Sequence, residues 1–537
     1  MKKNTFSIIA LFLFTSTILI YCNQDSKPKK EKERTVVKDV PKDISIAGSF
    51  SPQTSLVFDS SYINIFIDSF PVFKSLKTQI DTFYKKRNFS FAWYDNNGMI
   101  EPADNLYNHI LNISEEGLKD SFAYKTQLSN LMDMEGNNKK PSPMLDLMLT
   151  AQYLDYAKKV WSGVGEKKMT ELEWLLPRKE TSYEQLLDSL ISGKDVLKDA
   201  PVYRQYSLLK DYLKKYNAIK TAGGWETIKA DKKQYKIGDS GIVLSKVRKR
   251  LFVTGDLAEN NESQVFDSSL QTAIKKYEKR FGHKDDGILT AALIAEMNVP
   301  VEKRIEQIIV NMERSRWVPI NLQKDYLLIN IPDYKLYAFE NDVPVWNMNV
   351  VVGKDQHRTV IFNGDMKYIV FSPYWNITPS ILKDEVLPAI KRNPKYLAQH
   401  NMEWNGGNVR QKPGPDNSLG LVKFLFPNNF NIYLHDSPAK SLFKEDQRAF
   451  SHGCIRLAEP KKLAQYILRN DPAWNEAKIT AAMNKGVEQF VTLKTPVPVF
   501  IAYFTSWVDR QGNLNFRKDI YKRDQPLVEM ILDKGGK

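Results

Sequence analysis

The interpretation of this chain rests on one stretch, Ala449-Phe450-Ser451-His452-Gly453-Cys454-Ile455-Arg456-Leu457. A cysteine attacks as its thiolate, which cationic neighbours and hydrogen-bond donors favour. This stretch supplies such neighbours, because His452 precedes Cys454 and Arg456 follows it. A second histidine, His435, lies upstream at the end of an apolar run. The spacing predicts a thiol–imidazole site for acyl transfer.

The residues around Cys454 have expected roles. We expect neutral His435 to take the thiol proton and later return it to the leaving amine. The amides of Gly453 and Cys454 would point at the developing oxyanion. The cationic Arg456 would hold a substrate carboxylate or stabilise the thiolate. The predicted substrate-binding and oxyanion residues are Ser451, His452, Gly453 and Arg456.

Two other readings of these residues stay open. In the first, Cys454 only packs in the core, since a lone cysteine in a strand often acts as a small buried hydrophobic residue. Core packing does not explain the His-Gly that precedes it. His435 and His452 are candidate metal ligands. However, only one cysteine and no pair of carboxylates lie near them, so too few ligands are available to complete a metal site. A cysteine-rich zinc site is excluded, since the chain has only two cysteines. We therefore predict no metal site.

Apolar residues around this stretch recur with the period of two that is typical of strands. The predicted strands are Tyr326–Ile331, Lys335–Phe339, Val343–Val352, Tyr368–Phe371, Phe424–Phe426, Ile432–Leu434, Val499–Trp507 and Leu514–Phe516. They predict a β-rich domain over 326–510, with a C-terminal segment over 511–537. An insertion at about 375–420, with a predicted helix Ser380–Ala398, is placed to act as a lid over the site.

The preceding chain shows helical periodicity. Residues 50–235 are predicted to form a helical scaffold domain, apart from a short strand and turn at Phe91–Gly98. Residues 236–300 contain three short predicted helices separated by glycine turns, and Asp267 and Thr290 suit two of the N-caps. A linker helix lies in 301–325. The predicted fold class is multidomain α+β: a helical scaffold, a small three-helix domain, and a β-rich catalytic domain with an inserted lid.

The first residues are typical of a targeting signal. Lys2-Lys3 precede an apolar run too short to span a membrane comfortably, and the run closes at Cys22. This resembles a bacterial lipoprotein signal over 1–22, with lipid on Cys22 anchoring the protein in an envelope membrane and facing the periplasm. A plain secretory signal or an uncleaved anchor is the alternative, and either one implies export. If Cys22 carries lipid, Cys454 remains a free thiol.

Residues 23–49 are rich in charged residues, Pro and Ser and predict a flexible tether; a basic binding patch is the alternative. The net charge of +14 over 537 residues suits an anionic partner such as nucleic acid, a membrane or a cell-wall glycopeptide. The sequence has no nucleic-acid motif, and the export signal excludes nucleic acid as the partner.

His435 followed by Ser451-His452-Gly453-Cys454-Ile455-Arg456 resembles the signature of YkuD-type L,D-transpeptidases. Four further segments, Asn311–Trp317, Pro373–Pro379, Tyr433–Asp436 and Pro496–Tyr503, resemble the large YcbB-like branch of that family. In that branch a scaffold domain and a peptidoglycan-binding domain precede the catalytic domain. The three-helix region resembles such a peptidoglycan-binding domain, with a connector that binds no ligand as the alternative. This chain has His452 where the branch often has serine.

The resemblance implies an enzyme of peptidoglycan biosynthesis or remodelling. Cys454 would attack a tetrapeptide stem at diaminopimelate, release D-alanine, and pass the acyl group to the amine of an acceptor diaminopimelate, which gives a 3→3 cross-link. The family implies no cofactor, and the acylable thiol implies sensitivity to carbapenems. Two alternatives remain: an L,D-carboxypeptidase or hydrolase using the same site, and a non-catalytic peptidoglycan-binding lipoprotein.

Overall fold

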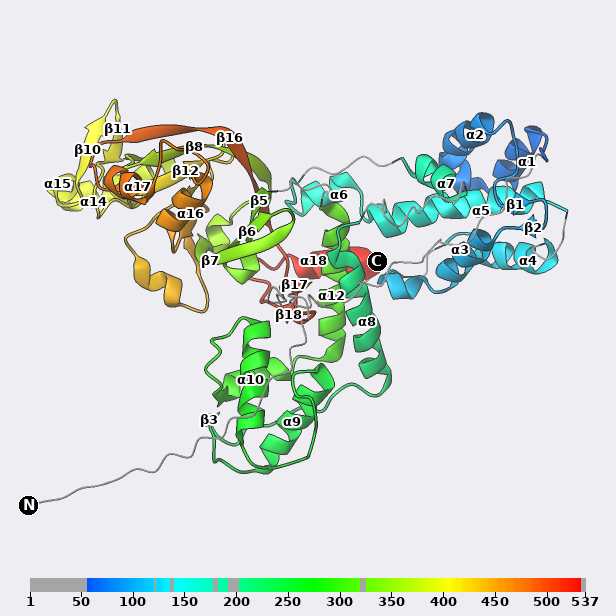
Figure 1. Ribbon diagram of the computed structural model, residues 1–537, viewed down its shortest axis with the longest axis horizontal. Helices are drawn as coiled ribbons and strands as arrows, with labels where there is room; N and C mark the ends of the chain where they lie inside the picture. The colour runs from blue at the N-terminus through cyan, green and yellow to red at the C-terminus, as the bar shows by residue number, and fades with distance from the viewer. Residues whose placement is uncertain are drawn as a thin grey trace, which may run out of the picture. The chain divides into compact units, whose positions relative to one another are not determined.

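The computed structural model describes residues 56–119, 122–135, 140–176, 182–191, 202–318 and 325–532. The expected signal peptide, Cys22 and the tether lie outside the described residues. Within these ranges no helix is long and apolar enough to cross a membrane. The multidomain α+β class is confirmed: helical parts precede a large mixed sheet (Figure 1).

The first part is helical, as predicted. Its helices are α1 (Ser61–Ser69), α2 (Lys77–Lys86), α3 (Glu101–Leu111), α4 (Lys125–Glu135), α5 (Pro143–Tyr156), α6 (Glu166–Glu171), α7 (Tyr183–Ile191) and α8 (Gln205–Thr221), with a short hairpin of β1 (Tyr94–Asp95) and β2 (Gly98–Met99). Helix α5 is almost entirely buried among the others and begins at an N-cap, Ser142. Its buried Asp146 accepts hydrogen bonds from the Trp93 amide and the Tyr84 hydroxyl, which fixes the hairpin on the helices.

The three predicted short helices are present as α9 (Ile242–Thr254), α10 (Ser268–Phe281) and α11 (Ala291–Met297). The side chains of Asp267 and Thr290 accept hydrogen bonds from amides of the first turns of α10 and α11, so both predicted N-caps are confirmed. Two-residue strands β3 (Gln234–Tyr235) and β4 (Leu289–Thr290) close this unit.

Helix α12 (Val301–Trp317) is more than a connector, because most of its residues are buried. It packs along α8 and against α18 (Asp524–Leu532), where Arg314 pairs with Asp524 at 2.7 Å. The described residues all belong to one compact unit.

The β-rich domain is built on a nine-stranded sheet in the order β14-β7-β15-β13-β12-β8-β16-β5-β6. Its strands are β5 (Asp325–Asn330), β6 (Lys335–Glu340), β7 (Val343–Gly353), β8 (Asn363–Phe371), β12 (Val422–Leu425), β13 (Leu434–His435), β14 (Ala449–Ser451), β15 (Ile455–Leu457) and β16 (Gln489–Ala502). Strand β6 also pairs with β7, which closes the sheet on itself around an apolar core. Two helices, α16 (Pro460–Ile467) and α17 (Glu476–Met483), link β15 to β16.

The predicted strand Val499–Trp507 is wrong. Strand β16 ends at Ala502, and β17 (Ser506–Val508) pairs instead with β18 (Leu514–Phe516). Between them the buried Thr505 donates its amide to Asn311 of α12 at 2.9 Å, which draws the chain away from the large sheet.

The insertion has its own fold. It contains β9 (Trp375–Asn376), α13 (Pro379–Ile381), a π-helical turn (Leu382–Val386), α14 (Leu387–Arg392), α15 (Tyr396–Gln399), β10 (Met402–Asn405) and β11 (Asn408–Gln411). The predicted continuous helix Ser380–Ala398 is wrong, because Pro394 excludes helical geometry at Asn393, which has φ −139° and ψ 100°. A small core of Ile377, Val386 and Val409 holds the segment together.

Candidate active site

The candidate site lies where β13 and β15 run parallel, with His435 opposite Arg456 and Leu434 opposite Ile455. Side chains alternate along a strand, so this register turns Tyr433, His435, Cys454 and Arg456 toward the same face. His435 and Cys454 are diagonal neighbours, and standard strand spacings put their backbone positions about 8 Å apart. The sheet therefore brings together the residues that the sequence predicted would meet.

The turn before the thiol is held by Ser451. Its hydroxyl donates to the Cys454 carbonyl at 2.5 Å and accepts from the Gly453 amide at 3.1 Å. Gly453 has φ +110°, a conformation that side chains rarely allow, and its carbonyl accepts from the Thr359 hydroxyl at 2.8 Å. Ser451 thus positions the turn, and the Gly453 amide is engaged in this state. Among the described residues the Cys454 amide has no hydrogen-bond partner, which leaves it as the candidate oxyanion donor.

The Cys454 thiol donates to the Asn431 carbonyl at 3.5 Å. Burial raises the pKa of this thiol, while hydrogen bonding to Tyr433 and the positive charge of Arg456 oppose the rise. The resting site therefore holds a protonated thiol, and proton removal has to accompany attack.

His435 is buried and neutral. Burial lowers its pKa to about 3, helped by the positive charges of Arg456 and Lys423. Its Nδ1 lies 2.5 Å from the Asp436 carbonyl, which can only accept, so Nδ1 carries the proton and Nε2 is left as the proton acceptor. The described structure has no hydrogen bond between His435 and Cys454.

The Arg456 guanidinium forms no ion pair or hydrogen bond with any described residue, and its Nε is buried without a partner. A half-buried guanidinium left unpaired beside a thiol is suited to an incoming carboxylate. Tyr433 is the site residue that our sequence reasoning missed. The signal was present, because Tyr433 stands two positions before His435 in a predicted strand and so shares its face.

His452 turns toward the insertion. Its Nε2 lies 3.0 Å from Glu385 in the π-helical turn, and its ring lies 4.8 Å from that of His357. The structure therefore places the His452 side chain against the insertion. Its role in substrate binding or in the oxyanion site stays a prediction. Sequence reasoning did not single out Glu385.

Comparison with known proteins finds a matching family model for the β-rich domain. Residues 324–499 match the model of the L,D-transpeptidase catalytic domain of the YkuD family. The chain carries a YkuD-type L,D-transpeptidase domain. Residues 78–213 match a scaffold-domain model, within the helical part.

The chain resembles a curated protein from Haemophilus influenzae named "Putative L,D-transpeptidase". The two are 27% identical over 432 residues, which cover 75% of this chain and 80% of the relative. Among solved structures, an L,D-transpeptidase from Stackebrandtia nassauensis has 12% identity and a TM-score of 0.23, covering 51% of this chain and 97% of that one. One from Mycobacterium smegmatis has 11% identity and a TM-score of 0.20, covering 33% and 58%. These scores are too low to add to the argument.

Proposed function

We propose that this enzyme cross-links peptidoglycan with Cys454 as its nucleophile and His435 as its general base. The observation that carries the proposal is the shared face of β13 and β15, where a thiol, a neutral imidazole and an unpaired guanidinium meet. These are the groups that acyl transfer to and from a carboxylate-bearing peptide needs.

In the first step, Sγ attacks the carbonyl of diaminopimelate in a tetrapeptide stem while Nε2 of His435 takes the thiol proton. Collapse of the tetrahedral intermediate breaks the peptide bond, and D-alanine leaves as an amine after receiving that proton. The thioester is then attacked by the side-chain amine of an acceptor diaminopimelate, and the proton released restores the thiol. Arg456 binds a carboxylate of the donor stem, and the Cys454 amide stabilises the oxyanion.

The enzyme acts outside the cytoplasm, as its substrate requires. We propose that lipid on Cys22 anchors it facing the periplasm and that 23–49 holds the folded part away from the membrane. We propose that it belongs to the YcbB-like branch; the resemblance of Asn311–Trp317 and Pro373–Pro379 to that branch and the helical domains ahead of the sheet support this assignment.

The test is covalent labelling by a carbapenem, read by mass spectrometry of the intact protein and of its peptides. We expect one adduct, on Cys454, and none on the Cys454→Ala variant. A well-folded wild-type protein without an adduct would overturn the proposed mechanism and favour a non-catalytic wall-binding role.

Water competes with the acceptor amine for the same thioester, so hydrolysis is the second candidate. Incubation with a disaccharide tetrapeptide separates the two. A cross-linked dimer identifies transfer, and tripeptide alone identifies an L,D-carboxypeptidase.

A further inference from the structure

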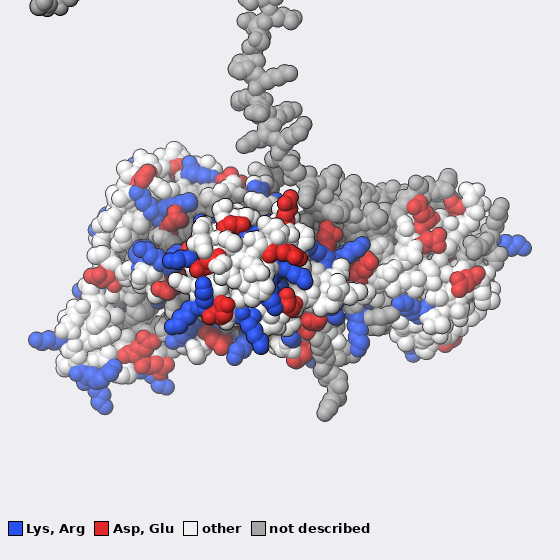
Figure 2. Space-filling view, turned by 90° about the horizontal axis from the view of Figure 1, so that it is seen from below, with Lys and Arg blue, Asp and Glu red and all other residues white. Residues whose placement is uncertain are grey.

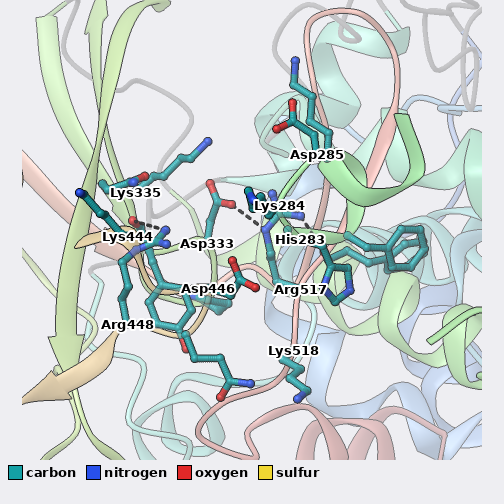
Figure 3. A pocket seen from close by; sticks show the side chains of 18 of the residues that line it. His283, Lys284, Asp285, Asp333, Lys335, Lys444, Asp446, Arg448, Arg517 and Lys518 are labelled. Carbon is teal, nitrogen blue, oxygen red and sulfur yellow. Dashed lines mark hydrogen bonds and ion pairs between the residues drawn. The ribbon is translucent and has the colours of Figure 1, made fainter. Parts of the chain in front are cut away.

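A cleft of about 560 Å³ lies apart from the thiol, between the three-helix unit, strand β6, the loop before β14 and the segment after β18. Its cationic lining includes Lys284, Lys335, Lys444, Arg448, Arg517 and Lys518. Figure 3 shows Lys335, Lys444 and Arg448 on one side of the cleft and Lys284 with His283 on the other.

Cations outnumber acids in this lining by seven to four. One of the acids, Asp333, is already paired with Arg517 at 2.7 Å and also accepts a hydrogen bond from Tyr337. Lys335, Lys444 and Lys518 form no ion pair with any described residue. Unpaired charges of one sign in a concave site focus the field and attract anions.

The cationic wall is preformed. Arg517 donates to the Arg280 carbonyl at 2.7 Å and lies 4.8 Å from the centre of the Trp507 ring. Arg448 donates to the carbonyls of Glu445 and Tyr334, at 2.5 and 3.3 Å. A ligand therefore meets charges already in place, which lowers the entropy lost on binding.

A second groove, of about 370 Å³, continues from the cleft, because Lys279, Lys335 and Arg517 line both. Its walls are mainly apolar and aromatic, with Leu328, Tyr337, Val345 and Trp507 among them. The combined surface, which we name the cationic–aromatic cleft, suits a ligand with a neutral body and spaced negative groups. A polymer charged at every backbone unit, such as a polyphosphate, would leave the apolar half unmatched.

The cationic–aromatic cleft lies close to the thiol along the chain. Strand β14 starts directly after Arg448, and Cys454 follows Arg448 by six residues. Six extended residues span at most about 20 Å. One linear polymer is long enough to occupy the cleft and the thiol site together.

We propose that the cationic–aromatic cleft binds a glycan strand through the carboxylates of its peptide stems, at a distance from the stem that is acylated. This inference rests on the proposed function, since it takes peptidoglycan as the polymer. It does not follow from general basicity, because Figure 2 shows basic and acidic side chains interspersed over the face of the molecule that it draws.

The test uses the full-length protein with Cys454→Ala, so that binding is measured without turnover. A fluorescent glycan chain with free stem carboxylates is compared with the same chain after amidation, by anisotropy at low ionic strength. Lys284→Glu/Lys444→Glu/Lys518→Glu reverses three exposed charges of the cleft. Lys85→Glu/Lys220→Glu/Lys485→Glu reverses three exposed charges elsewhere as the matched control.

We expect the cleft variant to bind the carboxylate chain about tenfold more weakly than the control variant. The amidated chain should bind both variants equally. Equal affinity of the two variants for the carboxylate chain would overturn the inference. So would a polyphosphate that displaces the chain from the cleft as effectively as a carboxylate chain does.

Failure of the proposed function has a separate readout. A missing carbapenem adduct on wild-type Cys454 overturns the mechanism, but it leaves the binding comparison interpretable because that comparison does not use the thiol. Conversely, the wild-type protein could form the adduct but bind the carboxylate chain and the amidated chain with equal affinity. The proposed function would then stand, and the proposed binding of glycan by the cationic–aromatic cleft would be wrong.

Discussion

Glu385 Oε1 lies 3.0 Å from His452 Nε2, which ties the π-helical turn of the insertion to the turn that carries the thiol. The pair is charged only when His452 is protonated, and burial lowers the pKa of His452, with the charge of Glu385 opposing that shift. Opening of the insertion is therefore linked to the protonation of His452.

Glu385→Gln should loosen the insertion. Both side chains are well exposed, so the pair contributes at most about 1 kcal/mol, or roughly fivefold in the opening equilibrium. Hydrogen exchange over 380–392 should be faster in the variant, and the difference should grow as the pH falls, because a protonated His452 strengthens the pair. The neighbouring exposed Asp384→Asn is the control; equal exchange in the two variants would show that the pair does not hold the lid.

His435→Gln should slow acylation of Cys454 while leaving the fold intact. General-base help is worth roughly 10²–10⁴-fold in rate, and glutamine cannot take a proton. Carbapenem acylation kinetics measure the loss, with circular dichroism to check the fold. His400→Gln, in the insertion, is the matched control and should acylate normally. Retention of more than about a tenth of the wild-type rate by His435→Gln would contradict its role as base.

Stability should fall in acid partly because of His435. Its folded pKa is about 3, whereas the ordinary value is 6.5, so between these pH values the unfolded chain binds a proton that the folded chain does not. The free energy of unfolding therefore decreases as the pH falls from 6.5.

Denaturant unfolding at pH 6.5 and pH 5 measures this loss. The wild type should lose about 2 kcal/mol more than His435→Gln over that range, since each pH unit corresponds to about 1.4 kcal/mol for one proton. Equal losses in the two proteins would show that the imidazole is not held neutral.

Glu313→Ala should strongly destabilise the contact between α12 and the helical domain. The fully buried Glu313 pairs with Arg316 at 2.6 Å and accepts from the amide of Val164 and the indole of Trp317. Its removal leaves the buried Arg316 guanidinium without its carboxylate partner, which costs about 3–5 kcal/mol. Thermal unfolding measures the effect, and the exposed Glu302→Ala on the same helix should change stability by less than about 0.5 kcal/mol. Similar unfolding temperatures for the two variants would contradict the buried network.

Local chemistry made much of the fold predictable. Strands β5, β6 and β7 begin and end within a residue or two of the predicted ranges, because their apolar residues alternate. The N-caps Asp267 and Thr290 could be predicted from the sequence, because a short polar side chain ahead of an apolar run accepts a hydrogen bond from a free amide of the first helical turn. The break at Asn393 also follows from the sequence, because Pro394 disfavours helical geometry in the residue before it.

Other features depend on partners distant in sequence. The end of β16 at Ala502 depends on the hydrogen bond from Thr505 to Asn311, which lies nearly two hundred residues away. No local sequence pattern predicts that contact. The burial of α12 and the pair of Glu385 with His452 are of the same kind.

The sequence by itself indicated the groups proposed for the chemistry: Cys454, His435 and Arg456 follow from residue type and spacing, since reactivity belongs to the side chain. Only the tertiary structure decided the pKa values of these groups and the residues that surround them. Parallel pairing of β13 with β15 puts them on one face, and burial there holds His435 neutral and raises the thiol pKa. The cationic–aromatic cleft likewise exists only because segments remote in sequence fold against one another, which brings together charges that are scattered along the chain.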